Sequence, residues 1–232
     1  MPLDHQFPIT YLITDGATTS ATTPQSADFA RLLELIERAV AARLSLVQIR
    51  EKRLRPRVLY ELTRRAAAIT GGSRTRLLLN DRADIACAGG ADGVHLTAVS
   101  LEARAVRRAF GDGFIIGVST HSLAEAAAAR QDGADFALLG PIFDTPSKRR
   151  YGAPLGVERL GEAATALDPF PLIAIGGVSL ANLSSVLRAG ARGIAAIRLF
   201  HEARDLAETV RLINEAGAQI GGAPPPQAGA RQ

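Results

Sequence analysis

Short apolar runs recur along the chain and are separated by longer stretches in which apolar and polar residues mix. The runs are almost continuously apolar and rich in β-branched residues, which is typical of strands buried on both faces of a parallel sheet. We predict strands over residues 9–13, 46–49, 77–79, 93–96, 115–118, 136–139, 172–175 and 193–197.

The stretches between these runs have the 3.6-residue period of amphipathic helices. The clearest of them carries its apolar residues at Phe29, Leu32, Leu33, Ile36 and Val40. Glycine closes two others just before the next strand, at Gly133 and Gly190, where it suits a helix C-terminal cap. The repeating unit is therefore a strand followed by a helix.

The number of these units distinguishes two folds that alternate strands and helices. Eight units favour a closed barrel, whereas a doubly wound sheet has fewer strands and a glycine-rich turn after the first. Residues 14–18, TDGAT, lack the G-x-G-x-x-G pattern of that turn. We predict an α/β fold, a single-domain (βα)8 TIM barrel over residues 1–220, with a disordered tail rich in Pro and Gly over 221–232.

Composition narrows the class of protein. With 232 residues, 47% of them hydrophobic, the chain can bury one sizeable core. Its N-terminal residues have neither the pattern of a signal peptide nor the length of a membrane span. Cys87 is the only cysteine, so no internal disulfide forms, and we expect it to be buried in a helix. We expect a cytoplasmic protein that does not enter membranes.

The net charge of +4 raises the question of nucleic acid, but the arginines are spread over helix-like stretches without interleaved aromatic residues. We therefore expect no nucleic-acid partner. Lysine is rare, and both lysines, Lys52 and Lys148, lie in segments that follow predicted strands. The oligomeric state stays open, a homo-oligomer included.

Polar residues gather where the predicted strands end, which is where TIM barrels carry their chemistry. Gln48, Arg50 and Lys52 alternate at period two, so they would share one face and suit a phosphate or diphosphate. The alternative is that Lys52 and Arg53 begin a solvated helix, with Glu51 paired locally to an arginine.

Two further segments suit phosphorylated ligands. Asn80 and Asp81 follow the third strand, where a carboxylate could hold Mg²⁺ with substrate oxygens, or could simply cap a helix. Gly176 and Gly177 end the seventh strand and would open a helix towards an anion, although glycine also serves plain turns. The long segment 140–148 has the character of a functional loop.

Taken in order, these motifs resemble the thiamine phosphate synthase and thiazole tautomerase (TenI-type) superfamily. The resemblance runs from about residue 11 to residue 200 and rests on VQIREK, NDR, ADGVHL, GVS, GPIF, TPSK and AIGG at successive strand ends. It implies a barrel that joins hydroxymethylpyrimidine diphosphate to thiazole phosphate and releases diphosphate. Small-molecule substrates and Mg²⁺ are its expected partners.

The resemblance also implies a role for each matching residue. Gln48, Arg50 and Lys52 would hold the pyrimidine diphosphate with Asn80 beside it, and Asp81 would coordinate Mg²⁺. Ser119 and Lys148 would serve the reaction, at the reacting centre and on the diphosphate. Thr145 and Gly177 would contact thiazole phosphate. We also expect Ser147, Gly176, Ile197 and Arg198 to bind substrate.

The chain departs from the family pattern at three places. Synthases usually continue His-Leu with Gly-Gln-x-Asp, whereas residues 97–100 here read TAVS, so Ser100 replaces a second magnesium carboxylate. Arg198 replaces a small serine and could bind the phosphate or fill its site, and Asp144 replaces a proline. Metal-dependent synthesis therefore depends on a weakened or rearranged site.

These departures leave alternatives to the synthase. A thiazole tautomerase would use His121 as acid and base, since imidazole suits proton transfer at neutral pH. His121 could equally be a surface residue at a helix start. A third reading is a non-catalytic binder of thiazole phosphate or thiamine phosphate, and other phosphate-binding barrels, such as sugar phosphate isomerases, stay open on fold alone.

Overall fold

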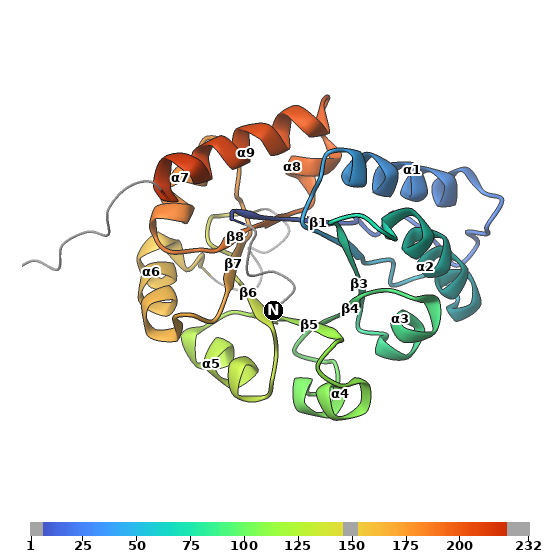
Figure 1. The fold of residues 1–232 in the computed structure, drawn as a ribbon, viewed down its shortest axis with the longest axis horizontal. Helices are drawn as coiled ribbons and strands as arrows, with labels where there is room; N and C mark the ends of the chain where they lie inside the picture. The colour runs from blue at the N-terminus through green and yellow to red at the C-terminus, as the bar shows by residue number, and fades with distance from the viewer. Residues whose placement is uncertain (1–6, 146–152, 222–232) are drawn as a thin grey trace, which may run out of the picture.

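The computed structural model of the chain describes residues 7–145 and 153–221. Parallel strands, each hydrogen-bonded to the next, close into a barrel in which β8 pairs with β1 (Figure 1). The strands are β1 (Ile9–Ile13), β2 (Leu46–Ile49), β3 (Arg76–Asn80), β4 (Gly93–Leu96), β5 (Ile115–Thr120), β6 (Phe136–Leu139), β7 (Leu172–Ile175) and β8 (Gly193–Ala196). The predicted TIM barrel is confirmed.

The helices surround the strands in chain order, so that the last one returns beside the first (Figure 1). They are α1 (Ala27–Ala41), α2 (Pro56–Thr70), α3 (Ala83–Gly89), α4 (Ala103–Phe110), α5 (Leu123–Gln131), α6 (Gly156–Leu167), α7 (Leu183–Arg188), α8 (Arg198–His201) and α9 (Leu206–Gly221). Helix α9 packs on both α1 and α7 and thereby closes the outer ring. The predicted tail over 221–232 lies, after Gly221, outside the described residues.

Two apolar cores follow from the alternation of side chains along each strand. One lies between the barrel and the helices, where Leu12, Val47 and Ile116 meet the buried faces of α1 to α9. The other fills the barrel itself with residues such as Tyr11, Leu78 and Phe136. Because both faces of every strand are buried, the strands read as continuous apolar runs, as the sequence predicted.

Strand ends differ from the prediction by one or two residues. Strand β3 includes Asn80, β5 continues through Ser119 and Thr120, and β8 stops at Ala196, one residue before Ile197. Polar residues extend β5 because Thr120 Oγ1 donates to Leu138 O on the neighbouring strand, at 2.9 Å. Ser119 is thus held by a strand and does not belong to a loop.

The predicted glycine caps are confirmed, and the placement of the cysteine was wrong. Gly133 and Gly190 follow helices α5 and α7 with φ values of 84° and 95°, a conformation that glycine adopts readily. Cys87 is exposed on α3, where Ile85, Ala86 and Gly89 form the buried face. A seven-residue helix has only a narrow buried stripe, and Cys87 falls outside it.

A repeated device ties the strands together at the N-terminal end of the barrel. A polar residue stands directly before each of β2, β4 and β6. Its side chain accepts a hydrogen bond from a backbone N–H of the preceding strand, at the second residue of that strand. The bonds run from Thr10 N to Ser45 Oγ at 3.2 Å, from Leu77 N to Asp92 Oδ2 at 2.8 Å and from Ile116 N to Asp135 Oδ2 at 2.7 Å.

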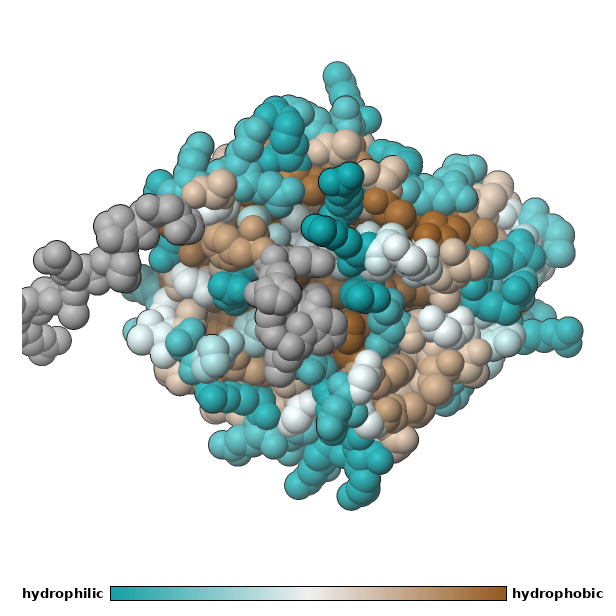
Figure 2. All heavy atoms as spheres, viewed as in Figure 1, coloured by the Kyte–Doolittle hydropathy of each residue, from teal (hydrophilic) through white to brown (hydrophobic). Residues whose placement is uncertain are grey.

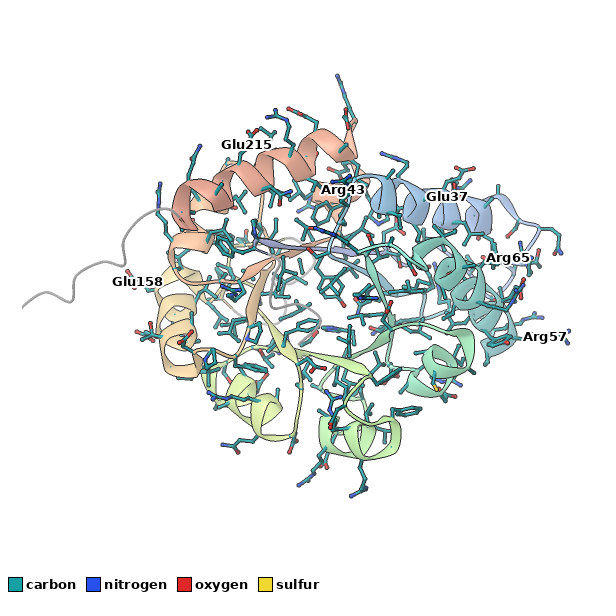
Figure 3. All side chains as sticks on the ribbon, viewed as in Figure 1. Glu37, Arg43, Arg57, Arg65, Glu158 and Glu215 are labelled. Atoms are coloured by element: carbon teal, nitrogen blue, oxygen red, sulfur yellow. The ribbon has the colours of Figure 1, made fainter. Side chains whose placement is uncertain are left out.

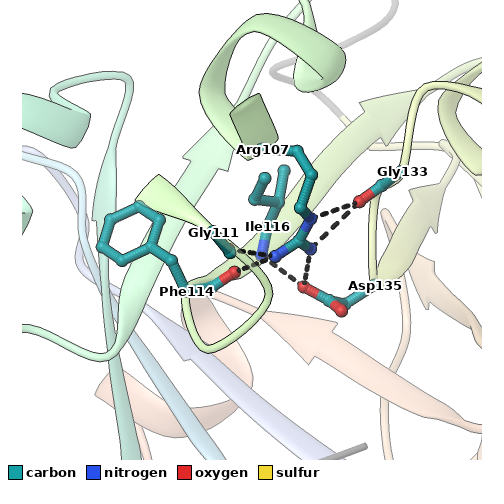
Figure 4. Close-up of polar contacts among 6 residues, drawn as sticks. All are labelled: Arg107, Gly111, Phe114, Ile116, Gly133 and Asp135. Atoms are coloured by element: carbon teal, nitrogen blue, oxygen red, sulfur yellow. Dashed lines mark hydrogen bonds and ion pairs between the residues drawn. The ribbon is translucent and has the colours of Figure 1, made fainter. Parts of the chain in front are cut away.

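Arg107 of α4 adds a second layer of bonds at the same end (Figure 4). Its guanidinium donates to the carbonyl oxygens of Gly111, Phe114 and Gly133 and to Asp135 Oδ2, at distances from 2.7 to 3.1 Å. The side chains of Arg107 and Asp135 are 18% and 12% exposed, so this ion pair is largely shielded from water. The arginine joins α4 to the starts of β5 and β6.

The charged side chains lie mainly on the outer helices. Figure 2 shows hydrophilic residues around the margin of the molecule, and Figure 3 shows Glu37, Arg57, Glu158 and Glu215 at its outer edge. Acidic and basic residues are interspersed there, as in the pairs of Glu61 with Arg64 and Arg65. Within residues 7–145 and 153–221, no helix is long and apolar enough to cross a membrane.

Candidate active site

The inner wall of the barrel is polar on one side and apolar on the other. Because side chains alternate along a strand, polar residues face inward from four consecutive strands, at Gln48 of β2, Asn80 of β3, His95 of β4 and Ser119 of β5. The opposite wall presents Ile13, Leu138, Ile175 and Ile197. A ligand that enters from the C-terminal end would meet donors on one side and hydrocarbon on the other.

Hydrogen bonds to the end of β1 hold the segment that follows β2. Arg50 N donates to Thr14 Oγ1 at 2.8 Å, and the buried carboxylate of Glu51 accepts from Gly16 N, Thr18 N and Thr18 Oγ1. The shortest of these bonds, from Thr18 Oγ1, is 2.6 Å. Glu51 therefore fixes the loop after β1 and does not pair with a neighbouring arginine.

The structure brings Gln48 and Arg50 together but separates Lys52 from them. Strand β2 ends at Ile49, and Lys52 is exposed in a turn, so the period of two does not reach it. Helix α2 begins only at Pro56, so Lys52 and Arg53 do not start a helix either. Lys52 lies at the rim with a mobile aliphatic stem that can turn inward or outward.

Asp81 adopts an unusual backbone conformation at the end of β3. Its φ is 67°, in the left-handed region that few residues other than glycine adopt, and its N–H donates to His95 O at 2.9 Å. The N-cap of α3 is Arg82, which pairs with Asp84. Asp81 does not cap the helix, and its exposed carboxylate makes no hydrogen bond or ion pair with the described residues.

Ser100, at the position of the expected second carboxylate, has a local structural role. Its Oγ accepts from Thr97 N at 2.8 Å and lies 3.1 Å from Thr97 Oγ1, which closes the loop after β4. Across residues 7–145 and 153–221, no three His, Cys, Asp or Glu side chains form a metal-binding cluster. Asp81, the residue that the sequence predicted to bind Mg²⁺, does lie at the C-terminal rim.

A buried histidine contacts the serine assigned to the reacting centre. His95 Nε2 lies 2.8 Å from Ser119 Oγ, while the imidazole packs edge-on against Tyr11 and beside Phe136. Burial, and secondarily the positive charge of Arg50, lowers the pKa of His95 to about 3. The imidazole is therefore neutral at physiological pH.

No role was predicted for His95 from the sequence, although the sequence around it indicated one. His95 is a polar residue within the apolar run 93–96, which was itself predicted to be buried on both faces. A polar side chain in such a run must find a partner inside the protein, since an unsatisfied buried polar group is costly. Its partner, Ser119, was already a candidate.

Three buried polar atoms of the inner wall have no hydrogen-bond partner among the described residues. They are Tyr11 OH, Gln48 Nε2 and His95 Nδ1, on side chains that are at most 2% exposed. Native proteins leave few buried polar groups unsatisfied, and such exceptions often serve a function. The Gln48 amide lies one residue before the end of β2 and two residues before Arg50.

The loops after β6 and β7 are locked together. Ile142 N donates to Ile175 O and Phe143 N to Gly176 O, at 2.9 and 3.0 Å. Gly176 and Gly177 have φ values of 94° and 68°, and a Cβ on Gly177 would lie 2.7 Å from Phe143 Cβ. Both glycines are thus required by conformation and by the close approach of the other loop.

The expectation that the two glycines open a helix was wrong. Helix α7 begins at Leu183, because Asn182 first closes a turn by accepting from Ser179 N and donating to Gly177 O. The helix dipole therefore does not point from Gly177. Thr145, in the loop after β6, is buried, and Ser147 and Lys148 lie outside the described residues.

Comparison with known proteins agrees with this architecture. Residues 11–200 match the family model described as thiamine monophosphate synthase. The chain belongs to the thiamine monophosphate synthase family. It is 35% identical over 211 residues to a thiamine-phosphate synthase from Roseiflexus castenholzii, covering 91% of this chain and 89% of the relative. It is 40% identical over 187 residues to one from Methanoculleus marisnigri, covering 81% and 84%.

Solved structures give the same result. The thiamine phosphate pyrophosphorylase from Pyrococcus furiosus superposes with a TM-score of 0.77 at 26% identity, covering 93% of this chain and 98% of that one. A 3-hexulose-6-phosphate synthase superposes with a TM-score of 0.62 at 17% identity, over 89% and 98%. The second likeness concerns the barrel alone. Membership of the thiamine monophosphate synthase family rests on the matches in sequence.

Two residues that distinguish the readings within this family lie at the surface. His121 is about half exposed, with 49% of its side chain accessible, and its Nδ1 lies 3.3 Å from Glu125 Oε2 at the start of α5. Arg198 is exposed at the first residue of α8 and makes no side-chain hydrogen bond or ion pair with the described residues. Its guanidinium is therefore accessible to solvent just past the C-terminal end of β8.

Proposed function

We propose that this protein joins hydroxymethylpyrimidine diphosphate to thiazole phosphate, forming thiamine phosphate and releasing diphosphate. The observation that carries the proposal is the polar half of the inner wall, where Gln48 presents an unsatisfied amide in line with Arg50. A planar heterocycle with a diphosphate needs such an amide and such a cation. The names of the relatives point to the same reaction.

The diphosphate would bind on the side of β2, β3 and β6. Arg50 would hold it as a planar fork, and Lys52 and Lys148 would add point charges from two loops. Gln48 and Asn80 would line the pyrimidine ring. Glu51 supports this arrangement indirectly, since it ties the segment that carries Arg50 and Lys52 to the loop after β1.

Thiazole phosphate would bind on the side of β7 and β8. The backbone of Gly176 and Gly177 would face its phosphate, with Thr145 and Ser147 from the preceding loop. Ile197 belongs to the apolar wall and would lie against the thiazole ring. Arg198 would add a cation that has no competing ion pair among the described residues.

Asp81 fits a magnesium ion that is shared with the substrate. Mg²⁺ is commonly bound through one or two protein carboxylates, with substrate phosphate oxygens and water completing its shell. Asp81 offers one exposed carboxylate at the rim, and its left-handed backbone holds it there. Bound in this way, Mg²⁺ would neutralise charge on the diphosphate.

The reaction requires charge stabilisation and no strong base. The bond between the pyrimidine methylene carbon and the diphosphate oxygen breaks, and its electron pair leaves with the diphosphate. The lone pair of the thiazole nitrogen then forms the new bond to that carbon. Fixed cations at Arg50 and Lys148 would stabilise the charge that develops on the leaving group.

The tautomerase reading depends on His121, and the geometry favours the synthase over it. An acid–base residue works best when it is shielded and within reach of the proton that it moves. His121 is about half exposed, and its Nδ1 lies 3.3 Å from Glu125 Oε2 at the surface. We therefore assign His121 to the exposed bend that precedes α5.

The proposal is tested by mixing the purified protein with both substrates, with and without Mg²⁺, and measuring thiamine phosphate and diphosphate. We expect equal amounts of the two products, formed only when Mg²⁺ is present. Arg57→Ala is the matched control for the loss of positive charge in Arg50→Ala, since Arg57 lies exposed at the outer edge of α2 (Figure 3). No product at any Mg²⁺ concentration would overturn the proposal.

A further inference from the structure

We propose that His95 is a positioning residue that donates a hydrogen bond from Nε2 to Ser119 Oγ, so that the serine hydroxyl must donate its own hydrogen to the bound substrate. The two atoms are 2.8 Å apart. His95 is 2% exposed and Ser119 is half-buried, so the imidazole lies behind the serine as seen from the barrel mouth. This inference deepens the proposed function and rests on it.

The surroundings of the imidazole decide which nitrogen carries the proton. Nδ1 has no hydrogen-bond partner among the described residues, and a Cβ placed on Gly117 would lie 2.7 Å from it. A proton on Nδ1 would leave a buried N–H unsatisfied, which is rarer in proteins than an unsatisfied acceptor. The proton therefore resides on Nε2, the nitrogen that faces Ser119.

The same feature rules out a nucleophilic serine. A histidine that activates serine is itself oriented by a third group, usually a carboxylate on its other ring nitrogen. Among residues 7–145 and 153–221, Nδ1 of His95 has no such group.

Three neighbours hold the ring in place. Tyr11 contacts it edge-on, with ring centroids 5.8 Å apart, and Phe136 lies 6.1 Å away and itself packs edge-on against Tyr11. Gly117 on β5 provides the space, since a side chain there would collide with both His95 and Phe136. The backbone of His95 also accepts from Asp81 N at 2.9 Å, so one residue orients both Ser119 and the candidate magnesium ligand.

An obligate donor at Ser119 suits an acceptor atom of the pyrimidine diphosphate. That acceptor is a ring nitrogen or an oxygen of the leaving diphosphate. Charge on the leaving oxygen grows in the transition state, so donation to it raises kcat, whereas a ring nitrogen is bound equally before and during the reaction and affects KM. Kinetics of the variants separate the two acceptors.

The first test observes the proton directly. The chain has four histidines, so a long-range ¹H–¹⁵N spectrum of the full-length protein is simple, and the signals absent from His95→Gln assign His95. We expect a neutral ring with the proton on Nε2. A proton on Nδ1, or on both nitrogens at neutral pH, would overturn the proposal whether or not the protein makes thiamine phosphate.

The second test couples the two side chains. Ser119→Ala should lower kcat/KM by about 3- to 10-fold, the worth of one hydrogen bond, and should have no further effect in a His95→Leu background. His95→Gln keeps a donor near the position of Nε2 and should recover most of the activity lost in His95→Leu. Additive effects, or equal activity of the Gln and Leu variants, would contradict a positioning role.

These tests distinguish failure of the inference from failure of the proposed function. Absence of thiamine phosphate in the wild-type reaction would reject the function and leave the tautomer to be read from the spectrum. Product in the wild type with additive variants would reject the inference alone. Unfolding curves of each variant show whether a loss of activity reflects a loss of folded protein.

Discussion

The two ends of the barrel treat polar groups in opposite ways. At the N-terminal end, Ser45, Asp92 and Asp135 each accept a backbone N–H from the neighbouring strand, and Arg107 satisfies three carbonyl groups and a carboxylate. On the inner wall towards the C-terminal end, Gln48 Nε2 and His95 Nδ1 have no partner among the described residues.

The difference indicates a division of labour. Bonds that are complete within the protein stabilise the fold and leave nothing for a ligand, whereas unsatisfied groups cost stability unless a ligand completes them. TIM barrels follow this rule in general, with stability at one face and chemistry at the other. The following changes test it, from the largest expected effect to the smallest.

Arg107→Ala should lower the free energy of unfolding by about 2–4 kcal/mol, because it leaves Asp135 and several carbonyl groups without their donor. Denaturant titration measures the change, and Arg108→Ala, an exposed neighbour on α4, is the control. Activity per folded molecule should stay at the wild-type level. A large loss of activity in a fully folded Arg107→Ala sample would contradict the separation of the two ends.

Stability should fall in acid partly because of His95. The pKa of His95 is about 3 in the folded protein against 6.5 for the unperturbed group. Below pH 6.5 the unfolded chain therefore binds a proton at this residue, whereas the folded protein does not. The contribution is complete above pH 6.5 and is lost at about 1.4 kcal/mol per pH unit as the pH falls towards 3. Between pH 7 and pH 4, the free energy of unfolding of wild type should therefore fall faster than that of His95→Gln, by about 1.4 kcal/mol per pH unit. Parallel curves for the two proteins would disprove this contribution of His95.

Gly177→Ala should impair the thiazole phosphate side more than the fold. The left-handed backbone costs about 1–2 kcal/mol for alanine, and the new methyl group would press on Phe143 and displace the loop after β6. We expect about a 10-fold rise in KM for thiazole phosphate. Gly113→Ala is the control, since nothing lies within 4 Å of a Cβ there. An unchanged KM would place that phosphate elsewhere.

Ser100→Asp should give the smallest effect, an increase of about 3- to 10-fold in apparent Mg²⁺ affinity. The aspartate can still accept from Thr97 N, so the loop after β4 should persist. Ser100→Asn has a similar shape without the charge and serves as the control. The Mg²⁺ dependence of the initial rate measures both variants, and a matching response of the Asn and Asp variants would show that charge at this position is irrelevant.

The sequence predicted most of the fold because each strand is buried on both faces. Continuous apolar runs at 136–139 and 172–175, too short for a typical helix, indicate buried strands, and the glycines at 133 and 190 close helices by local chemistry alone. Strand ends were harder. Whether Ser119 and Thr120 continue β5 depends on a bond to Leu138 on another strand, which no local pattern encodes.

The candidate site divides along the same line. Gln48 faces inward because β2 has a regular alternation, which could be read from the sequence. Arg50 lies one residue past the end of the strand, and its charge acts on the inward-facing His95. Lys52 leaves the pattern because the strand has already ended, and Gly177 turns away from any helix because Asn182 intervenes. The bond between His95 and Ser119 joins positions 24 residues apart and required the closed barrel.

The central claim is that the polar wall at the C-terminal end carries the reaction while the N-terminal end carries stability. The most direct measurement is the rate of thiamine phosphate formation by Arg50→Ala, with its unfolding curve, beside wild type. We predict that the rate falls by about 100-fold or more while the free energy of unfolding stays within about 0.5 kcal/mol. A fully folded Arg50→Ala protein that forms thiamine phosphate at the wild-type rate would contradict the account.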